Sequence, residues 1–381
     1  MARPNDHMSP QALRTIAAIV ALAAGLAVVW GMPLAAQGPT PAASCDPIGP
    51  VKFVCGQAGP EDLVAVPDSR FLIASAFGGD GGLFLVDTRA ATSTKLYPSA
   101  TAAHRLDAAI YAACPGPPQT SPRFQTHGLF LKPGSGGRHT LLVVGHGNRE
   151  SVEVFELDAR GSSPAITWVG CAVAPDPIGL NSVLALPEGG FVATNFQSRA
   201  PAGRAGGGFS SALVKGENNG ELWEWQPRAG WAKVPGSEAA GANGLELSKD
   251  GKWFYVAQWG NKSFMRVSRG QTPVKRDVIS LGFRVDNVRW APDGTLLVAG
   301  QGGPDCAVLL GQPPGAGPCS GVSTSTIGKV DPDKWTYTQL VDYPTTSVIS
   351  AATVAVQVGN ELWTGSFRGD RIARYPAAGL R

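Results

Sequence analysis

Short runs of alternating apolar and polar residues fill the chain after about residue 45, and these runs repeat. Each copy opens on a polar residue, continues through an apolar alternation, turns, and returns through a second apolar run. Alternation with period two, rich in β-branched and aromatic residues, predicts antiparallel strands. The copies begin at Glu61, His127, Asn181, Asn243, Asp286 and Thr353. Two strands and a turn therefore recur six times.

A third predicted strand follows every copy. These third strands end at Asp87, Asp158, Gln226, Ser268, Asp333 and Pro376. Six units of three to four strands predict an all-β fold, a six-bladed β-propeller. A β-sandwich or a pair of barrels is the alternative, which six matched units disfavour. The unequal spacing places loops at about 89–125, 197–219 and 301–325, where long loops commonly act as lids or substrate-binding segments.

The N-terminal segment has the pattern of an export signal. Arg3 and Arg14 give a basic start, and an uncharged, largely apolar stretch runs from Thr15 until Asp46. The stretch is also long enough for an uncleaved membrane anchor. We therefore expect residues 1–45 to be a signal peptide or anchor with a short linker, and residues 46–381 to form the propeller. The protein is expected to be periplasmic or secreted, with membrane attachment through this segment as the alternative.

Charge and cysteine content narrow the function further. The net charge is only +3, and the Lys and Arg residues are scattered along the chain without forming a basic stripe. Nucleic acid is therefore not an expected partner. Six cysteines without a CxxC motif, in an exported chain, favour disulfides over a zinc site. The expected pairs are Cys306 with Cys319, Cys45 with Cys55, and Cys114 with Cys171.

The polar residues that open the repeats predict a cation site. In a propeller the innermost strand of each blade runs along the central channel, so its first residues converge at one mouth. Carboxylate and amide oxygens are the ligands that Ca²⁺ prefers. The candidate ligands are Glu61, Asn181, Asn243, Asp286 and Asn287. His127 is a poor calcium ligand and suits acid–base chemistry instead. The alternative is that Asn and Asp simply cap turns between blades.

Several segments resemble the serum paraoxonase and arylesterase family, in the same order along the chain. These are GPEDL at 59–63, THGL at 126–129, LLVVGHGNRESVEVFEL at 141–157, LNSVLALP at 180–187, ANGLELSKDGKWFYVA at 242–257 and VDNVRWAPDG at 285–294. The similarity covers most of residues 55–376 and includes two histidines nineteen residues apart. The wider relatives are the gluconolactonase and strictosidine-synthase-like propellers.

The resemblance implies a catalytic calcium held by the same five residues, with His127 and His146 beside it. It also implies a second, structural calcium bound by Asp62 and the backbone carbonyl of Leu129. Ser182 stands where the family has a further aspartate, so the second site departs from the pattern. Paraoxonases join the N-terminal segment to the last blade by a disulfide, but no cysteine follows Cys319 here. Closure of the propeller must then use strand pairing or another bridge.

These residues predict a calcium-dependent hydrolase of lactones or aryl esters, whose partner is a small ester or lactone. The cation would polarise the carbonyl, and His127 would take a proton from water with help from His146. Asp286 acting as a nucleophile is the competing mechanism. The absence of a GxSxG elbow disfavours a serine hydrolase. The alternatives are a sugar-lactonase-like or strictosidine-synthase-like enzyme, and a non-catalytic extracellular binding scaffold.

Overall fold

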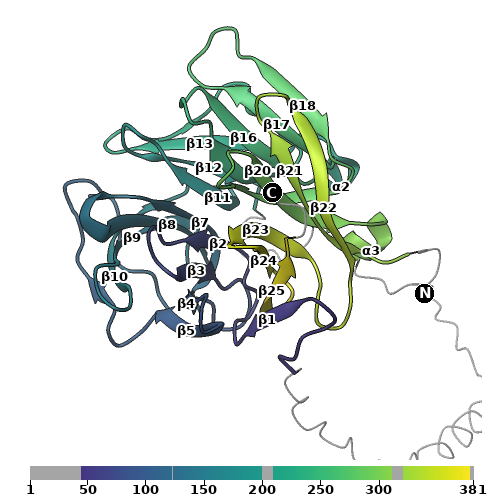
Figure 1. The fold of residues 1–381 in the computed structure, drawn as a ribbon. Coiled ribbons are helices and arrows are strands. Elements are labelled where there is room, and N and C mark those ends of the chain that lie inside the picture. Colours follow the sequence, from purple (N-terminus) through teal and green to yellow (C-terminus); the bar gives the residue numbers. More distant parts are fainter. Residues whose placement is uncertain (1–43, 122, 200–208, 311–320, 378–381) are drawn as a thin grey trace, which may run out of the picture. The chain divides into compact units, whose positions relative to one another are not determined.

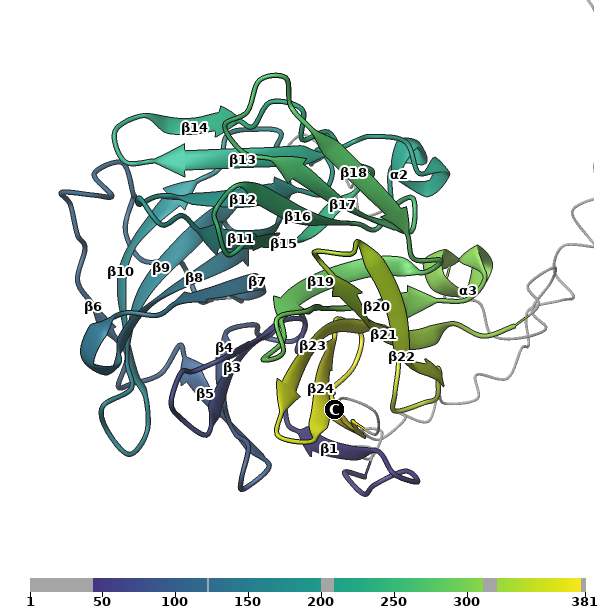
Figure 2. The ribbon, with the colours of Figure 1, turned by 45° about the horizontal axis from the view of Figure 1, so that its top comes forward.

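The computed structural model describes residues 44–121, 123–199, 209–310 and 321–377, and Cys45–Arg381 forms one compact unit. Six sheets of four or five strands surround a common centre (Figures 1 and 2). The expected all-β, six-bladed β-propeller is therefore confirmed. The predicted signal or anchor segment lies almost wholly outside the described residues.

The first three blades follow one another along the chain, and the four main strands of each run from the innermost to the outermost. In blade two, a short additional strand precedes the innermost one and pairs with the outer strand. Blade one contains β2 (Leu63–Ala65), β3 (Phe71–Ser75), β4 (Leu83–Asp87) and β5 (Thr92–Tyr97). Blade two contains β7 (Gln125–Lys132), β8 (Arg138–His146), β9 (Ser151–Asp158), β10 (Ala165–Val173) and β6 (Ala103–His104), with the 3₁₀ turn η1 (Ser135–Gly137). Blade three contains β11 (Leu180–Ala185), β12 (Phe191–Asn195), β13 (Glu221–Gln226) and β14 (Gly230–Lys233).

Blades four and five repeat this order, and blade six takes its outermost strand from the N-terminal end of the described chain. Blade four contains β15 (Ala242–Leu247), β16 (Trp253–Gln258), β17 (Ser263–Ser268) and β18 (Arg276–Ser280). Blade five contains β19 (Arg284–Trp290), β20 (Leu296–Gly302), β21 (Thr324–Asp331) and β22 (Thr336–Pro344). Blade six contains β23 (Ala352–Val358), β24 (Glu361–Ser366), β25 (Arg371–Pro376) and β1 (Lys52–Cys55).

Burial falls from the inner strands to the edge strands in blades three and four. The inner strands β11 and β15 are buried over nearly their whole length, whereas the edge strand β18 alternates between exposed and half-buried residues. A strand covered on both faces needs a nearly continuous apolar run, while an edge strand needs apolar residues on one face only. The edge strands consequently give weak sequence signals. The structure places β5, in sequence TSTKLY, inside the range 89–125 that the sequence predicts as a loop.

The ring is closed by strand pairing between the two ends of the described chain. The N-terminal strand β1 pairs antiparallel with β25 of the last blade, with Lys52 opposite Arg374. Closure therefore takes the first of the two expected routes. The Cys45–Cys55 disulfide joins the segment before β1 to the end of that strand, so it stays within the N-terminal region.

The Cys114–Cys171 disulfide is also present, and it joins the segment after β6 to β10. Two disulfides indicate an oxidising compartment. The expected partner of Cys306, Cys319, lies outside the described residues. The short helices α2 (Ser211–Lys215) and α3 (Asp305–Leu310) occupy parts of the other two expected loops. Over the described ranges, no helix has both the length and the apolar character to cross a membrane.

Candidate functional site

Five of the predicted site residues, His127, Asn181, Asn243, Asp286 and Asn287, lie in β-bulges near the start of the innermost strands, whereas Glu61 directly precedes Asp62 and β2. In five of the six blades, three residue steps on the inner strand match two on its neighbour. The bulges fall between Thr126 and Leu129, Leu180 and Val183, Ala242 and Leu245, Val285 and Val288, and Ala352 and Ala355. A bulge re-aims the side chains of the residues it contains. Each of these bulges contains the polar residue that opens its copy of the repeat.

Two glycines let neighbouring inner strands approach closely at these bulges. A Cβ atom on Gly128 would lie 2.6 Å from the Cα atom of Ser182, and one on Gly244 would lie 2.6 Å from the Cα atom of Asn287. These glycines directly follow His127 and Asn243 in the chain. Any larger residue would push the blades apart. The close approach draws the functional side chains of adjacent blades together.

We call Glu61, Asn181, Asn243, Asp286 and Asn287 the axial cluster. All five are at most 5% exposed. Asn287 Nδ2 donates a hydrogen bond to Glu61 Oε1 over 2.7 Å, and the side chain of Asn243 is hydrogen-bonded to Asp286. His127 lies between Asn181 and Glu61, because its Nε2 atom lies 3.4 Å from Asn181 Nδ2 and 3.7 Å from Glu61 Oε1. The structure thus brings together all five residues that the sequence singles out as ligands.

The oxygens of the axial cluster fit a hard cation. Four buried side-chain oxygens have no hydrogen-bond partner among the described residues: Glu61 Oε2, Asn181 Oδ1, Asn243 Oδ1 and Asn287 Oδ1. Unpaired buried acceptors are costly and uncommon in native structures. Carboxylate and amide oxygens gathered in one place match the preference of Ca²⁺, which takes six to eight oxygens including waters. The cluster therefore passes the chemical test for the ion that the sequence predicts.

The pKa shifts of the two carboxyl groups in the cluster also favour a bound cation. Burial, followed by the neighbouring carboxylates of Asp286 and Asp62, raises the pKa of Glu61 well above its usual range. Burial likewise raises the pKa of Asp286 to about 7. Two carboxylates at this depth are unfavourable as anions unless a cation balances them. In the described ranges, no three His, Cys, Asp or Glu residues are grouped so that they could hold a metal ion. The axial cluster is of a different kind, because it combines two carboxylates with three amides.

Asp286 is held by residues that the sequence analysis did not single out. Gln301 Nε2 donates to Asp286 Oδ2 over 2.8 Å and to the carbonyl of Ala352 over 2.6 Å. Trp259 Nε1 in turn donates to Gln301 Oε1 over 2.7 Å. Trp259 therefore supports the candidate ligand Asp286 through Gln301. No sequence signal pairs residues so far apart on different strands.

The two predicted histidines form one end of a hydrogen-bonded chain. Their strands pair antiparallel with Gln125 opposite His146, so the rings meet although nineteen residues separate them. His127 Nδ1 lies 2.9 Å from His146 Nε2, and His146 Nδ1 lies 2.9 Å from Glu150 Oε2. The other oxygen of Glu150 accepts the backbone N–H of Leu180 over 2.6 Å. Glu150 is the third member of the chain, and the sequence analysis missed it.

Glu150 fixes the positions of the protons along this chain. A carboxylate only accepts hydrogen bonds, so a neutral His146 carries its proton on Nδ1 and presents Nε2 as an acceptor. His127 must then donate from Nδ1, which leaves a lone pair on Nε2. Burial lowers the pKa of His127 well below its usual range, with a contribution from His146, which keeps the ring neutral. His127 Nε2 is thus a proton acceptor directed at Asn181 and Glu61 of the axial cluster.

The residues that the resemblance assigns to a second calcium bind an arginine instead. Arg289 Nη2 donates to Asp62 Oδ2 and to the carbonyl of Leu129, the latter over 2.9 Å. Asp62 is fully buried, and the Arg289 side chain is 8% exposed. Ser182, at the position of the missing aspartate, is buried as well. These residues do not fit a second metal ion, because a guanidinium already satisfies their oxygens.

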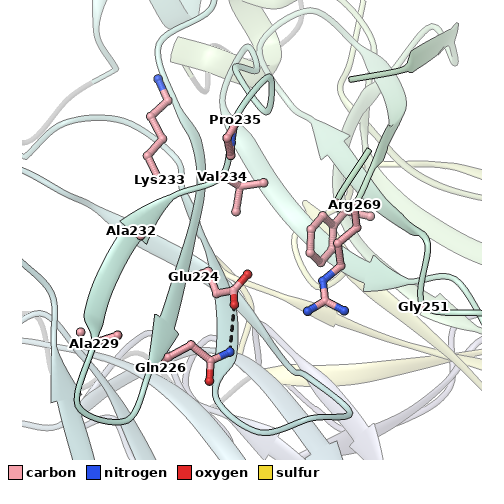
Figure 3. A pocket seen from close by; sticks show the side chains of 12 residues that line it. Glu224, Gln226, Ala229, Ala232, Lys233, Val234, Pro235, Gly251 and Arg269 are labelled. Atoms are coloured by element: carbon pink, nitrogen blue, oxygen red, sulfur yellow. Dashed lines mark hydrogen bonds between the residues drawn. The ribbon is translucent and has the colours of Figure 1, made fainter. Parts of the chain in front are cut away.

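A separate cavity of about 540 Å³ lies at the opposite ends of the strands. It lies between blades three and four, near the turns that follow β13 and β17, with Glu224, Gln226 and Arg269 among its lining residues. Figure 3 shows Glu224 and Gln226 hydrogen-bonded to each other on one wall, with Arg269 across from them. The register places Phe191 and Trp225 at this end, away from Leu180, so this cavity is not part of the axial site.

Neither a family model nor a curated protein sequence matches the chain. Among solved structures, a luciferin-regenerating enzyme is similar, with 14% identity, coverage of 86% of this chain and 92% of that one, and a TM-score of 0.48. Virginiamycin B lyase from Staphylococcus aureus shows 12% identity, 85% and 98% coverage, and a TM-score of 0.46. Regucalcin from Agrobacterium tumefaciens, a calcium-binding protein, shows 12% identity, 85% and 90% coverage, and a TM-score of 0.45. Similarity at this level does not identify a function, which has to follow from the site itself.

Proposed function

We propose that this protein is a calcium-dependent hydrolase of lactones or aryl esters, with the axial cluster as its cation centre. One juxtaposition carries the proposal. A histidine whose Nε2 lone pair is set by a carboxylate lies beside a buried set of unpaired carboxylate and amide oxygens. A general base next to a hard-cation site is the equipment that metal-assisted carbonyl hydrolysis requires.

The axial cluster would hold the ion through Glu61, Asp286 and the three asparagines. When bound, a calcium ion would polarise the substrate carbonyl and stabilise the oxyanion that develops on it. Burial of the cluster excludes bulk water, so charges in it interact more strongly than at the surface. Gln301 keeps Asp286 oriented toward the cluster through its hydrogen bond to Oδ2.

His127 is the proposed general base. Its Nε2 atom takes a proton from a water molecule while the water oxygen bonds to the carbonyl carbon. The resulting imidazolium keeps its Nδ1 hydrogen bond to His146, and the Glu150 carboxylate balances the added charge through that ring. When the ester C–O bond breaks, Nε2 returns the proton to the leaving oxygen. Phe77 packs on the His127 ring with centroids 4.6 Å apart and limits its rotation.

Asp286 as a nucleophile is the competing mechanism for the same reaction. It would form an acyl intermediate on a carboxylate oxygen, which water would later open. Gln301 Nε2 and the Asn243 side chain both hydrogen-bond to this carboxylate, and such bonds lower its nucleophilicity. This favours a role for Asp286 in holding the ion and leaves proton transfer to His127.

The expected setting is the periplasm or the extracellular space, and the expected partner is a small ester or lactone. The two disulfides support an oxidising location. Export through residues 1–45, and any attachment to a membrane by them, is a proposal from the sequence alone.

The test is hydrolysis of phenyl acetate and of a γ- or δ-lactone by the purified full-length chain, first with calcium and then with EDTA. Asp286→Ala and His127→Gln are compared with wild type. His104→Gln serves as the matched control, because His104 hydrogen-bonds to Tyr97 away from the cluster. Activity that needs calcium, is lost in Asp286→Ala and falls in His127→Gln supports the proposal.

Other outcomes would redirect the proposal. Calcium-dependent activity that His127→Gln leaves intact would move the chemistry to Asp286. A calcium-dependent rise in melting temperature without turnover of any lactone or ester, sugar lactones included, would favour a binding scaffold. Absence of any calcium effect on either activity or melting temperature would refute the cation centre.

A further inference from the structure

The guanidinium of Arg289 makes contacts that a metal ion could make. It donates from Nη2 to Asp62 Oδ2 and to the Leu129 carbonyl, from Nε to the Leu63 carbonyl over 3.2 Å, and from Nη1 to the Val288 carbonyl over 2.8 Å. A carboxylate and backbone carbonyls from three blades therefore converge on one buried positive charge. Hard divalent cations take the same mixture of oxygens.

The surroundings make that charge necessary. Asp62 is fully buried, and its other oxygen, Oδ1, accepts the N–H of Leu63 over 2.8 Å. The buried carboxyl of Glu246 is close enough to interact electrostatically with both Asp62 and Arg289. Without Arg289, two acidic side chains and several carbonyl oxygens would share a buried space without a counter-ion. An unpaired buried charge is among the most destabilising features in a protein.

We propose that Arg289 is a built-in cation that fills and closes a second divalent-cation site deeper along the axis. Its side chain takes the place of an exchangeable ion, so the inner part of the propeller stays assembled when calcium is removed. Two consequences follow for the number of ions. The wild-type protein leaves this inner position closed to calcium, and removal of the guanidinium opens it.

The experiment counts calcium ions per chain by isothermal titration and measures melting temperature in EDTA and in calcium, with the purified full-length protein. The main variant is Arg289→Ala. Arg289→Lys keeps the charge, and Asp62→Asn/Arg289→Ala removes both charges, so that a folded protein remains if the single variant unfolds in EDTA. Arg371→Ala is the matched control, since Arg371 is a buried arginine whose partner, Asp370, is mostly exposed.

We expect Arg289→Ala to bind one more calcium ion than wild type and to recover in calcium much of the melting temperature that it loses in EDTA. Arg289→Lys, the double variant and Arg371→Ala should show no additional ion. The inference depends only on the difference between variants, so it does not require the axial cluster to bind calcium. It would be overturned if Arg289→Ala gained no ion, or if Asp62→Asn alone removed an ion from the wild-type count.

Discussion

Glu61 and Asp62 are adjacent in the chain and both buried, yet their negative charges are balanced differently. Asp62 has a fixed partner in Arg289 and a donor for each of its oxygens. Glu61 has one oxygen hydrogen-bonded to Asn287 and another with no partner among the described residues. The inner region contains its own cation, whereas the axial cluster has oxygens arranged for one.

The difference shows that a propeller can place a stabilising ion pair and a candidate cation site at different positions along one axis. Every blade delivers polar residues to the centre, so buried charge accumulates there and must be balanced. A side-chain cation gives a permanent partner and a stable interior. An exchangeable ion leaves coordination positions open for a substrate. A substitution in the inner region should therefore affect stability, whereas a substitution in the axial cluster should affect calcium binding or turnover.

The largest expected effect comes from Glu150, beside the axial cluster. In Glu150→Gln the amide oxygen must still accept the Leu180 N–H, so the NH₂ group faces His146 Nδ1 and reverses both histidine tautomers. His127 Nε2 then carries a proton and is no longer a base. We expect kcat to fall by about 10²–10⁴-fold, the range for loss of a general base. The affinity for calcium, measured by titration, should stay near the wild-type value. Equal losses in kcat and in calcium affinity would instead indicate general damage to the site.

The next effect is on stability and belongs to the inner region. Arg289→Ala should lower the free energy of unfolding in EDTA by about 3–5 kcal/mol, because it leaves Asp62 buried without its partner. Urea denaturation followed by circular dichroism provides the measurement. A change of less than about 1 kcal/mol, the value for an exposed pair, would mean that the arginine is not needed to balance Asp62.

Glu61→Gln should act in the opposite direction on the calcium-free protein. It removes a buried carboxylate that forms no ion pair with Arg or Lys among the described residues, so the melting temperature in EDTA should rise. The same change removes one of two negative charges from the cluster, and calcium affinity should fall on the order of 10²-fold, since affinity depends on ligand charge. Differential scanning calorimetry with and without calcium tests both parts. A lower melting temperature in EDTA would remove the contrast with Arg289.

Gln301→Met tests the support behind Asp286. Methionine has a similar size but offers no N–H to Asp286 Oδ2 and no acceptor for Trp259. Loss of such a supporting hydrogen bond typically costs about 10–100-fold in metal affinity. We expect a decrease of that size by calcium titration, with little change in the His127 chain. Unchanged affinity would show that Asp286 is oriented by Asn243 alone.

The smallest effect is expected at the surface. Arg105 forms an ion pair with Glu156 over 3.2 Å, and the two side chains are 69% and 33% exposed. Arg105→Gln should change the free energy of unfolding by less than about 1 kcal/mol and leave calcium binding unaltered. The comparison with Arg289→Ala then measures what burial adds to an arginine–carboxylate pair. An effect as large as that of Arg289→Ala would break the distinction between fixed interior charge and solvated charge.

The inner strands and the residues that open them could be predicted because each carries a local signal. Alternating apolar residues mark the strands, and Glu61, His127, Asn181, Asn243 and Asp286 occupy matching places in the repeat. The edge strand β5 was not predicted, because a half-exposed strand needs few apolar residues. Glu150 escaped as well, because its role depends on the turn that returns the chain from His146.

The sequence by itself determined the number of blades, the three inner strands of each and the set of residues that open the inner strands, because these follow from periodicity along one chain. Only the tertiary structure decided which charges are balanced. Arg289 lies 227 residues from Asp62 along the chain, and their pairing exists because the fold brings blades one and five together at the axis. The same contact decided against a second calcium, since a guanidinium already satisfies the oxygens of Asp62 and Leu129. Pairing between buried charges depends on distance in space, and a repeat pattern does not record that distance.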